Sequence, residues 1–291
     1  MCDIITALQK EYLFLPPGRD AVCVYEVSLG LRRYFTGVVF CYFLLPGGNS
    51  MKKVLSCFSR GDIILWACSV LAVTVSFTIF GKNEYLTLCA SIVGVTSLIF
   101  NAKGHPFGQI LMLVFAVLYG IISYTFAYYG EMITYLGMTA PMAVLSLISW
   151  LRNPFEKGNA QVKVNKIKTK EYIFLAVLTA AVTVMFYFIL EKLNTANLIP
   201  STVSVTTSFI AAYLTFRRSE YYALAYAAND IVLVVLWVMA SITDRAYICT
   251  AVCFLIFLIN DIYGFISWSK MRKKQNGDVK NARTAGCKQP E

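Results

Sequence analysis

The chain has 291 residues, of which 58% are hydrophobic and 14% charged, and its formal net charge is +10. Because soluble domains carry roughly 25% charged residues, this composition excludes an ordinary soluble protein and indicates a membrane protein. The positive charge does not predict nucleic-acid binding, since the Lys and Arg residues fall in short stretches between apolar runs.

Residues 1–50 differ from the rest of the chain. Their longest apolar stretch, 34–45, is too short to cross a bilayer at about 1.5 Å of helix per residue. It ends at Pro46-Gly47-Gly48, the layout of a signal peptide does not fit well, and Met51-Lys52-Lys53 has the pattern of a natural start. We therefore expect 1–50 to be an N-terminal extension outside the functional unit, with an interfacial anchor as the alternative.

Eight apolar runs follow, and each is close to the roughly 20 residues that a helix needs to span about 30 Å of hydrocarbon. They are uniformly apolar and do not alternate, so we expect helices, whose backbone groups pair within the segment. The runs are 63–80, 85–101, 106–128, 131–151, 172–191, 198–216, 220–241 and 246–269.

Six of these runs form an internal repeat. Residues 85–151 contain three runs and end in Ile148-Ser149-Trp150, and residues 198–270 contain three runs whose last ends in Ile266-Ser267-Trp268. The single run between them makes the number of intervening crossings odd, so both units have the same orientation. The sequence thus predicts an all-α membrane protein with a 3+1+3 parallel repeat, one extra N-terminal helix, and a substrate site between the repeats, as in one class of transporters.

The repeat divides the chain into segments. They are 1–50, the extension; 51–84, with the first transmembrane helix; 85–151, the first three-helix repeat; 152–197, a cytoplasmic loop and linking helix; 198–270, the second three-helix repeat; and 271–291, a basic cytoplasmic tail.

The basic residues predict the orientation. If the first helix begins in the cytoplasm, 19 Lys and Arg residues face inward and three face outward. This asymmetry follows the positive-inside rule and predicts both termini in the cytoplasm. The longest loop, 152–171, is expected to lie near anionic lipid head groups, and the residues from 270 onward are expected to be disordered.

Two prolines lie inside apolar runs. Pro141 is near the middle of the run 131–151, where a missing backbone donor can kink a helix, and we expect a functional kink there. Pro200 is in the first turn of its run, where it is expected to be tolerated.

Polar side chains inside the apolar runs are the candidates for a substrate path, because an acid at mid-bilayer costs roughly 2.5–3.5 kcal/mol. On the helix 220–241, Tyr222, Tyr226 and Asn229 share one face, and Asp230 and Trp237 lie beside it. Aromatic rings can stack on a flat heteroaromatic solute, while amide and carboxylate groups can bond hydroxyls or a carboxamide. Simple packing between helices is the alternative for the two tyrosines.

Three further polar features in the apolar runs are candidates for contact with a substrate. Asn260, beside Asp261 in the run 246–269, is a second candidate, with an interhelical hydrogen bond as the alternative. Gln109 is the buried amide that the first repeat could contribute. The hydroxyl-rich stretch 201–208 is only weakly specific, because such groups often bond their own helix.

Motifs of other functions are absent from the sequence. It has no GxxxxGK[ST], HExxH, GxSxG or CxxC pattern and a single histidine, His105. Cys249 and Cys253 have helical spacing, but packed thiols are the better interpretation. We therefore predict no cofactor, no metal site and no enzyme activity. A proton-driven mechanism through Asp230 or Asp261 stays open, since two acids do not by themselves show coupling.

Several separated motifs in 51–274 resemble the nicotinamide riboside transporter (PnuC) family. These stretches are 101–109 with Asn101, Gly104 and Gln109; 129–138 (YGEMITYLGM); 149–154 (SWLRNP); the segment with Arg217, Arg218, Asn229, Asp230 and Trp237; and 260–268 (NDIYGFISW). They occur in order within the repeat layout.

The resemblance implies a SWEET-like fold in the bacterial inner membrane, facilitated diffusion of nicotinamide riboside, trapping by a cytoplasmic kinase that phosphorylates the substrate, and a homotrimer among membrane lipids. It implies substrate contacts by Gln109, Asn229 and Asn260. The complete candidate set for substrate binding is Gln109, Tyr222, Tyr226, Asn229, Asp230, Trp237, Asn260 and Tyr263.

The sequence departs from the family at one place. Many members carry a closely spaced tryptophan pair where this chain has Tyr222 and Tyr226, and relatives carry thiamine, riboflavin or deoxynucleosides. Another vitamin or nucleoside is therefore the alternative substrate. A non-transporting membrane receptor or assembly subunit, and a membrane enzyme, are the alternatives of other classes.

Overall fold

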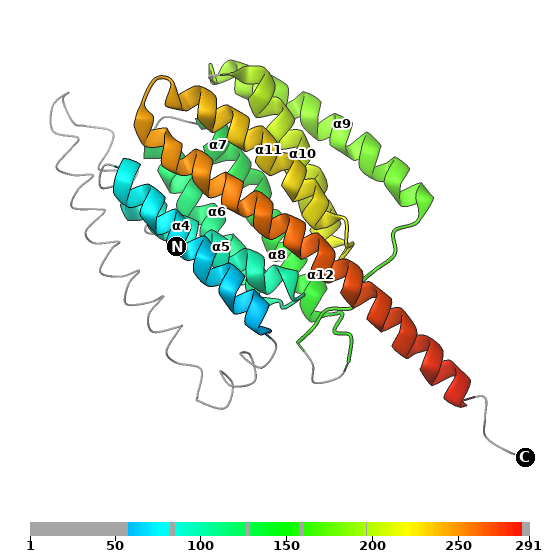
Figure 1. Ribbon diagram of the computed structural model, residues 1–291. Coiled ribbons are helices and arrows are strands. Elements are labelled where there is room, and N and C mark those ends of the chain that lie inside the picture. Colours follow the sequence, from blue (N-terminus) through cyan, green and yellow to red (C-terminus); the bar gives the residue numbers. More distant parts are fainter. Residues whose placement is uncertain (1–57, 82–84, 126–128, 157–159, 196, 287–291) are drawn as a thin grey trace, which may run out of the picture. The chain divides into compact units, whose positions relative to one another are not determined.

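The structure is a computed structural model, and it describes residues 58–81, 85–125, 129–156, 160–195 and 197–286. The expectation for 1–50 lies outside these residues. Figure 1 shows the described helices, which are α4 (Arg60–Phe80), α5 (Tyr85–Ala102), α6 (Phe107–Thr125), α7 (Tyr129–Ile133), the π-helix η1 (Thr134–Thr139), α8 (Ala140–Leu151), α9 (Thr169–Lys192), α10 (Leu198–Phe216), α11 (Tyr222–Ser241), the 3₁₀ turn η2 (Arg245–Tyr247) and α12 (Ile248–Gly286).

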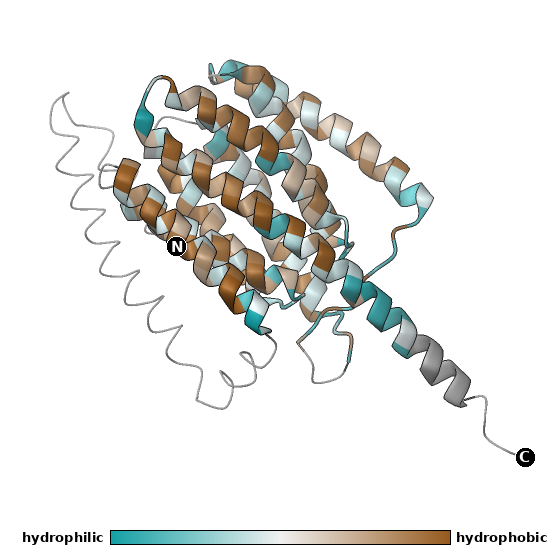
Figure 2. Cartoon of the chain, viewed as in Figure 1, coloured by the Kyte–Doolittle hydropathy of each residue, from teal (hydrophilic) through white to brown (hydrophobic). Residues whose placement is uncertain are grey.

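The prediction of eight transmembrane helices is confirmed among the described residues. Eight helical stretches are long and apolar enough to cross a membrane, with α7, η1 and α8 forming one of them. Figure 2 shows that hydrophobic residues dominate these stretches. Large apolar side chains such as Leu71, Val177 and Ile231 are exposed on the bundle surface, as expected for helices that face lipid.

The two groups of three helices contact each other along two edges. The first group (α5, α6 and α7–η1–α8) contacts the second (α10, α11 and α12) where α8 packs on α10 and where α5 packs on α12. The linking helix α9 packs on α10, and α4 packs on α5 and α12. We call the boundary between the two groups the seam.

The prediction of a disordered tail after residue 270 is wrong for the residues that the structure describes. Helix α12 continues to Gly286 and extends beyond the other helices in Figure 1, and Figure 2 shows a hydrophilic stretch where it leaves them. The cluster of basic residues after residue 269 consists of good helix formers. Buried Gln275 also fastens the helix, because its amide donates to the Val162 carbonyl at 3.0 Å and accepts from the Val164 N–H at 2.9 Å.

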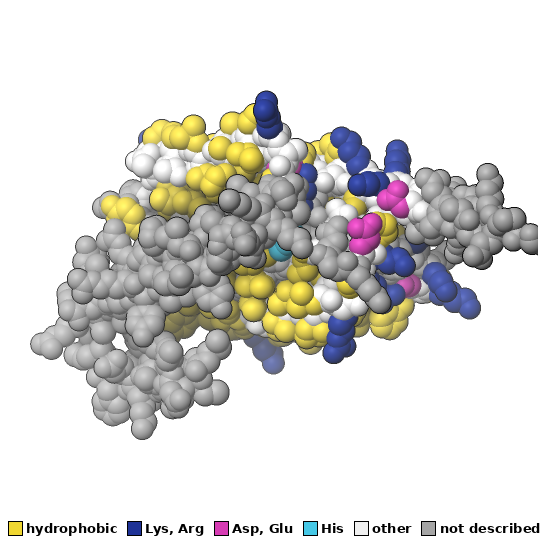
Figure 3. All heavy atoms as spheres, turned by 90° about the horizontal axis from the view of Figure 1, so that it is seen from below, with side chains coloured by type: hydrophobic (Ala, Val, Ile, Leu, Met, Phe, Trp, Pro, Cys, Tyr) yellow, Lys and Arg dark blue, Asp and Glu magenta, His cyan; other side chains and the backbone are white. Residues whose placement is uncertain are grey.

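Loop 152–168 is fastened at the same end of the bundle, which we call the basic end. Val162 N–H donates to the Gly104 carbonyl at 3.0 Å, and Asn165 N–H donates to the Arg218 carbonyl at 2.9 Å. In the face drawn in Figure 3, Lys and Arg side chains gather toward the end from which α12 extends. The basic loop is therefore a packed connector between the two groups of helices.

Pro141 follows a six-residue π-helical segment, Thr134–Thr139. Because proline has no backbone N–H, it cannot complete the α-helical ladder to the residue four before it, which favours a local change of hydrogen bonding. Such π-helical turns inside α-helices often occur at functional sites. The irregularity places Thr134 and Tyr135 at the seam.

Candidate substrate site

A small cavity lies in the seam, on the side away from the basic end. Its wall is formed by α7 and η1 from the first group, by α10 and α11 from the second, and by α9. The lining residues are Gly130, Glu131, Thr134, Tyr135, Leu190, Ser201, Ser204, Val205, Ser208, Leu233 and Leu236. We call it the seam cavity. The space open to the centre of a water molecule is about 20 Å³, which is room for about one water molecule.

Asn229 is joined to the hydroxyl groups along one wall of the seam cavity. Its Oδ1 atom accepts from Ser204 Oγ at 3.2 Å, Thr207 Oγ1 at 2.9 Å and Ser208 Oγ at 3.0 Å. Because a carbonyl oxygen has two lone pairs, these three hydroxyls cannot all bond it well together, and one donor can serve another acceptor. The predicted face of α11 thus meets the hydroxyl-rich face of α10 at Asn229.

Glu131 brings a carboxylate to the opposite wall of the cavity. Its Oε2 atom is enclosed, and no hydrogen-bond partner reaches it among the described residues. Thr134 and Tyr135 follow on the next turn and also line the cavity. The Tyr135 ring contacts Tyr119 of α6, with ring centroids 4.5 Å apart. The cavity wall therefore combines an acid, hydroxyls and an aromatic ring.

Asp230 of α11 and Asp261 of α12 are two acids buried between these packed helices. The Asp230 Oδ2 atom is enclosed and has no hydrogen-bond partner among the described residues. Asp230 therefore brings an unpartnered polar atom into the membrane-spanning part of the bundle, next to Asn229 in the chain.

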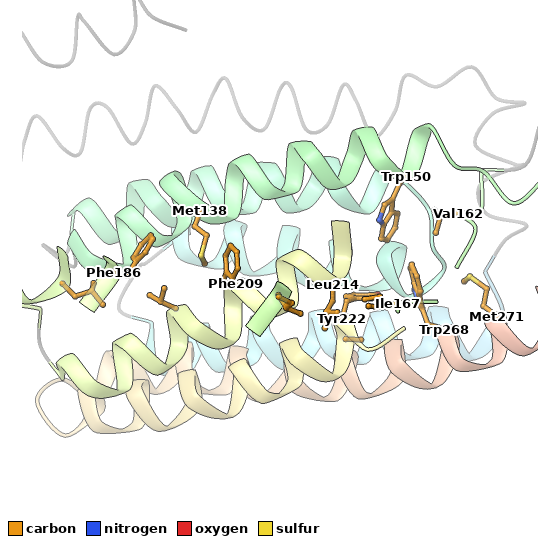
Figure 4. Close-up of a cluster of buried hydrophobic side chains, with 14 residues drawn as sticks. Met138, Trp150, Val162, Ile167, Phe186, Phe209, Leu214, Tyr222, Trp268 and Met271 are labelled. Carbon is orange, nitrogen blue, oxygen red and sulfur yellow. The ribbon is translucent and has the colours of Figure 1, made fainter. Parts of the chain in front are cut away.

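Trp150 and Trp268 fill the basic end of the seam. Their ring centroids are 5.4 Å apart, and both side chains are almost completely buried (Figure 4). Trp150 donates its indole N–H to the Thr215 carbonyl of α10 at 2.9 Å, and Trp268 donates to the Asn101 carbonyl of α5 at 2.7 Å. Trp150 lies near the end of α8 and Trp268 lies within α12, and each bonds the first helix of the other group, so the pair closes the seam at this end.

Tyr222 also helps to close the basic end of the seam. Its ring packs against Trp268 with centroids 4.9 Å apart and is 2% exposed. Tyr226 lies one turn further along α11, in edge contact with Tyr222 at 6.3 Å, and is only partly buried. Trp237 is at the other end of α11, where its ring contacts Tyr247. The predicted aromatic stripe is thus spread along the whole helix, and only Tyr226 lies between the tryptophan pair and Asn229.

Gln109 bonds within the first group. Its Nε2 atom donates to Asn101 Oδ1 at 2.8 Å, and Asn101 Nδ2 donates to Ser97 Oγ at 3.3 Å. The close approach of Gly108 makes this arrangement possible, since a Cβ atom there would lie 2.2 Å from Asn101 Oδ1. Gln109 therefore positions the residue whose carbonyl binds Trp268.

Asn260 and Tyr263 both bond the extra helix α4. Asn260 Nδ2 donates to Ser69 Oγ at 2.9 Å, and the Tyr263 hydroxyl donates to Asp62 Oδ1. Asp62 is completely buried, pairs with Lys103 at 2.6 Å and caps α4 through Ser59. The structure places these two candidates at the α4–α12 contact, and Asn229, Asp230 and Tyr226 at or near the seam.

Two ion pairs join elements at the basic end. Arg217, after α10, binds Glu171 of α9 through its Nη2 atom at 3.0 Å, and this partner raises the pKa of the guanidinium. Arg272 of α12 pairs with Glu220 in the α10–α11 turn. In the α5–α6 turn, burial lowers the pKa of His105.

The sequence does not indicate the cavity-lining residues that belong to the first group of helices. The sequence does not single out Glu131, because it stands at the start of an apolar run, where an acid usually faces the interface. The sequence signal for it is its spacing ahead of Thr134, Tyr135 and Pro141. Ser204 and Ser208 belong to the hydroxyl-rich stretch 201–208, which is only weakly specific.

Residues 84–270 match the family model described as "Nicotinamide mononucleotide transporter". The chain belongs to this family. Two curated relatives are each named "Nicotinamide riboside transporter PnuC": one from Neisseria mucosa is 24% identical over 218 residues, covering 73% of this chain and 82% of the relative. The other, from Haemophilus influenzae, is 21% identical over 214 residues, covering 73% and 92%.

A solved structure supports the same fold. "Crystal structure of the Vitamin B3 transporter PnuC" superposes with a TM-score of 0.64 at 21% sequence identity, covering 75% of this chain and 94% of that one. The chain is accordingly a multi-pass membrane protein of the PnuC type, and the family resemblance read from the sequence is confirmed. A functional interpretation of the seam therefore has to account for transport.

Proposed function

We propose that this PnuC-type transporter imports nicotinamide riboside across the bacterial inner membrane by facilitated diffusion. The observation that carries the proposal is the seam cavity, which both groups of helices line with polar side chains while the tryptophan pair closes one end. The curated relatives named as nicotinamide riboside transporters support this substrate.

The two groups of helices act as parallel repeats in a SWEET-like 3+1+3 arrangement. The reciprocal bonds of Trp150 and Trp268 support this arrangement, because a tryptophan that follows Ile-Ser in each third helix bonds the first helix of the other group. Two units linked by equivalent contacts can rock against each other about the seam, and such motion alternates access in transporters built from repeats.

The enclosed volume supports a closed state of this carrier. Ligand pockets for small molecules usually have volumes of about 300–1,000 Å³. The space available to water centres in the seam cavity is far smaller, at about 20 Å³. Entry of a nucleoside therefore requires the two groups to separate, and exit at the basic end requires the tryptophan pair to part.

Asn229 is the residue that we propose to bind the ribose or the carboxamide. Its amide Nδ2 has no hydrogen-bond partner among the described residues, while Oδ1 gathers three hydroxyls. Tyr226 would hold the ring, with Tyr222 behind it, and Asp230 would orient Asn229 or contact the ribose. Gln109 and Tyr263 would become available only if they exchanged their present partners for the solute. The same holds for Asn260 Nδ2, whereas the buried Oδ1 atom of Asn260 has no partner among the described residues.

Facilitated diffusion needs a cytoplasmic step that removes the substrate, and we assign this to a kinase that phosphorylates the nucleoside. Both termini would face the cytoplasm, as the loop charges predict. A homotrimer remains the predicted assembly. These points follow from the sequence resemblance and the basic end of the bundle.

The test is uptake of labelled nicotinamide riboside into proteoliposomes. We expect saturable uptake that equilibrates without accumulation and is unchanged by a protonophore, whereas accumulation against a gradient that the protonophore abolishes would reject facilitated diffusion. Saturable uptake of thiamine, riboflavin or a deoxynucleoside instead would reject the substrate. Binding without flux would indicate a receptor, and a product detected by mass spectrometry would indicate an enzyme.

A further inference from the structure

The membrane-spanning part of the bundle carries acids but no basic residue. The apolar stretches of the eight helices, taken between their terminal turns, contain no Lys, Arg or His. Within the same stretches Asp230 and Asp261 are buried, and Glu131, in the first turn of α7, is partly buried at the wall of the seam cavity. A buried carboxylate is stabilised by a cation or by several donors, and these stretches contain no basic side chain that could supply the cation.

Glu131 is the acid in the most direct contact with the seam cavity. It belongs to none of the ion pairs among the described residues. Its Oε2 atom is enclosed without a partner at the cavity wall. A carboxyl oxygen without a donor at an enclosed space is a position where a positive group would stabilise the charged form of the acid.

The side chains around Glu131 fit a flat organic cation. Tyr135 lines the same wall and packs beside Tyr119, and the faces of such rings attract cations. Ser201 and Ser204 stand on the wall formed by α10 and can bond hydroxyl groups. An inorganic cation would need more oxygen ligands, and the described residues hold no cluster of three acidic, His or Cys ligands for a metal ion.

We propose that Glu131 recognises the positive charge of the transported solute, and that this charge is the permanent one of an N-glycosylated pyridinium ring. The inference rests on the proposed function, since the ring nitrogen of nicotinamide riboside bonds ribose and is therefore cationic. Glu131 replaces part of the ring's hydration when the solute enters, and Tyr135 covers a ring face. Uncharged nucleosides of similar size gain nothing from the carboxylate.

The test compares nicotinamide riboside with its reduced dihydropyridine form, which keeps the ribose and the carboxamide but has no charge. Binding to the purified full-length chain is measured for the natural protein, for Glu131→Gln and for Glu156→Gln, whose carboxylate is exposed in the loop after α8. We expect the natural chain and Glu156→Gln to prefer the cation at least about tenfold. Glu131→Gln should reduce that preference by roughly tenfold and bind the reduced form nearly unchanged.

A conservative variant separates recognition from folding. Glu131→Asp keeps the charge and should keep the preference for the cation, with weaker binding of both compounds. Equal affinity of the natural chain for the two forms would overturn the inference. So would a Glu131→Gln variant that loses both ligands to the same extent, because that result indicates a structural role.

Failure of the proposed function gives a different result. If no nicotinamide compound binds, but the cation thiamine binds and Glu131→Gln weakens it about tenfold, the substrate assignment is rejected and the role of Glu131 stands. Selective binding of riboflavin or an uncharged deoxynucleoside, or of no cation at all, overturns both.

Discussion

Trp150 and Trp268 contact each other across the seam, and each donates its indole N–H to the other group of helices. Each follows an Ile-Ser pair, the pattern from which the sequence predicts an internal repeat. In the proposed transport cycle, this contact would fasten two groups of helices that move relative to each other. The remaining contacts at the basic end, including Tyr222 and loop 152–168, surround this pair.

Loss of the two indole bonds should open the basic end. Each neutral hydrogen bond contributes about 0.5–1.5 kcal/mol, so Trp150→Phe with Trp268→Phe should raise the open population several-fold to about a hundredfold. The measurement is maleimide labelling of a cysteine at buried position Met271 (Met271→Cys) in a variant without other cysteines. Trp66→Phe is the control, because its indole bonds Thr96 away from the seam. Equal labelling in all variants would contradict the closure.

Asn229→Leu should abolish saturable uptake while the protein still inserts and elutes as a folded species. The change removes the amide and leaves the hydroxyls of Ser204, Thr207 and Ser208 without their shared acceptor. Thr183→Val removes a polar contact with Thr206 between α9 and α10, outside the cavity, and should transport normally. Uptake by Asn229→Leu at the natural rate would reject this residue as part of the site.

Asn260→Leu and Tyr263→Phe should act through stability. Each removes a bond to α4, and interhelical hydrogen bonds in membranes contribute on the order of 1 kcal/mol. We expect a lower melting temperature in detergent and an affinity for nicotinamide riboside within about threefold of the natural protein. A large loss of affinity at unchanged melting temperature would instead place these residues in the substrate site, as the family resemblance implies.

Gln275→Ala should loosen loop 152–168. Gln275 supplies the side-chain bonds that hold Val162 and Val164 to α12. We expect faster tryptic cleavage after Lys163 or Lys166 in everted vesicles, where the cytoplasmic side is accessible under the predicted orientation. Lys273→Ala, on the exposed side of α12, should leave the cleavage rate unchanged. Identical rates in both variants would show that α12 does not hold the loop.

The sequence by itself determined the eight membrane-spanning helices and the family. Hydrocarbon thickness fixes the length of an apolar run, and no water is present to satisfy an open backbone, so continuous apolar runs had to become helices. The need of Asn229 for polar neighbours was also predictable, because an Asn-Asp pair lies at the middle of an apolar helix, and three hydroxyls of α10 bond its Oδ1 atom. The expectation of a disordered tail from residue 270 is wrong for the described residues, because the helix there is stabilised by a contact that the sequence does not reveal. Gln275 bonds a loop that lies over a hundred residues earlier in the chain.

Only the tertiary structure decided which neighbour each polar face meets. Helical periodicity groups Tyr222 with Asn229, and Asn260 with its own helix face, but it does not say which helix covers that face. In the folded chain α4 covers Asn260 and Tyr263, while Glu131 at a helix start is turned into the seam. The physical reason is that the surface of a transmembrane helix is apolar on its lipid-facing side as well as on its buried side. The amphipathic pattern that identifies the buried face of a helix in water is therefore missing. Only the packing of the helices determines which helix covers each polar side chain.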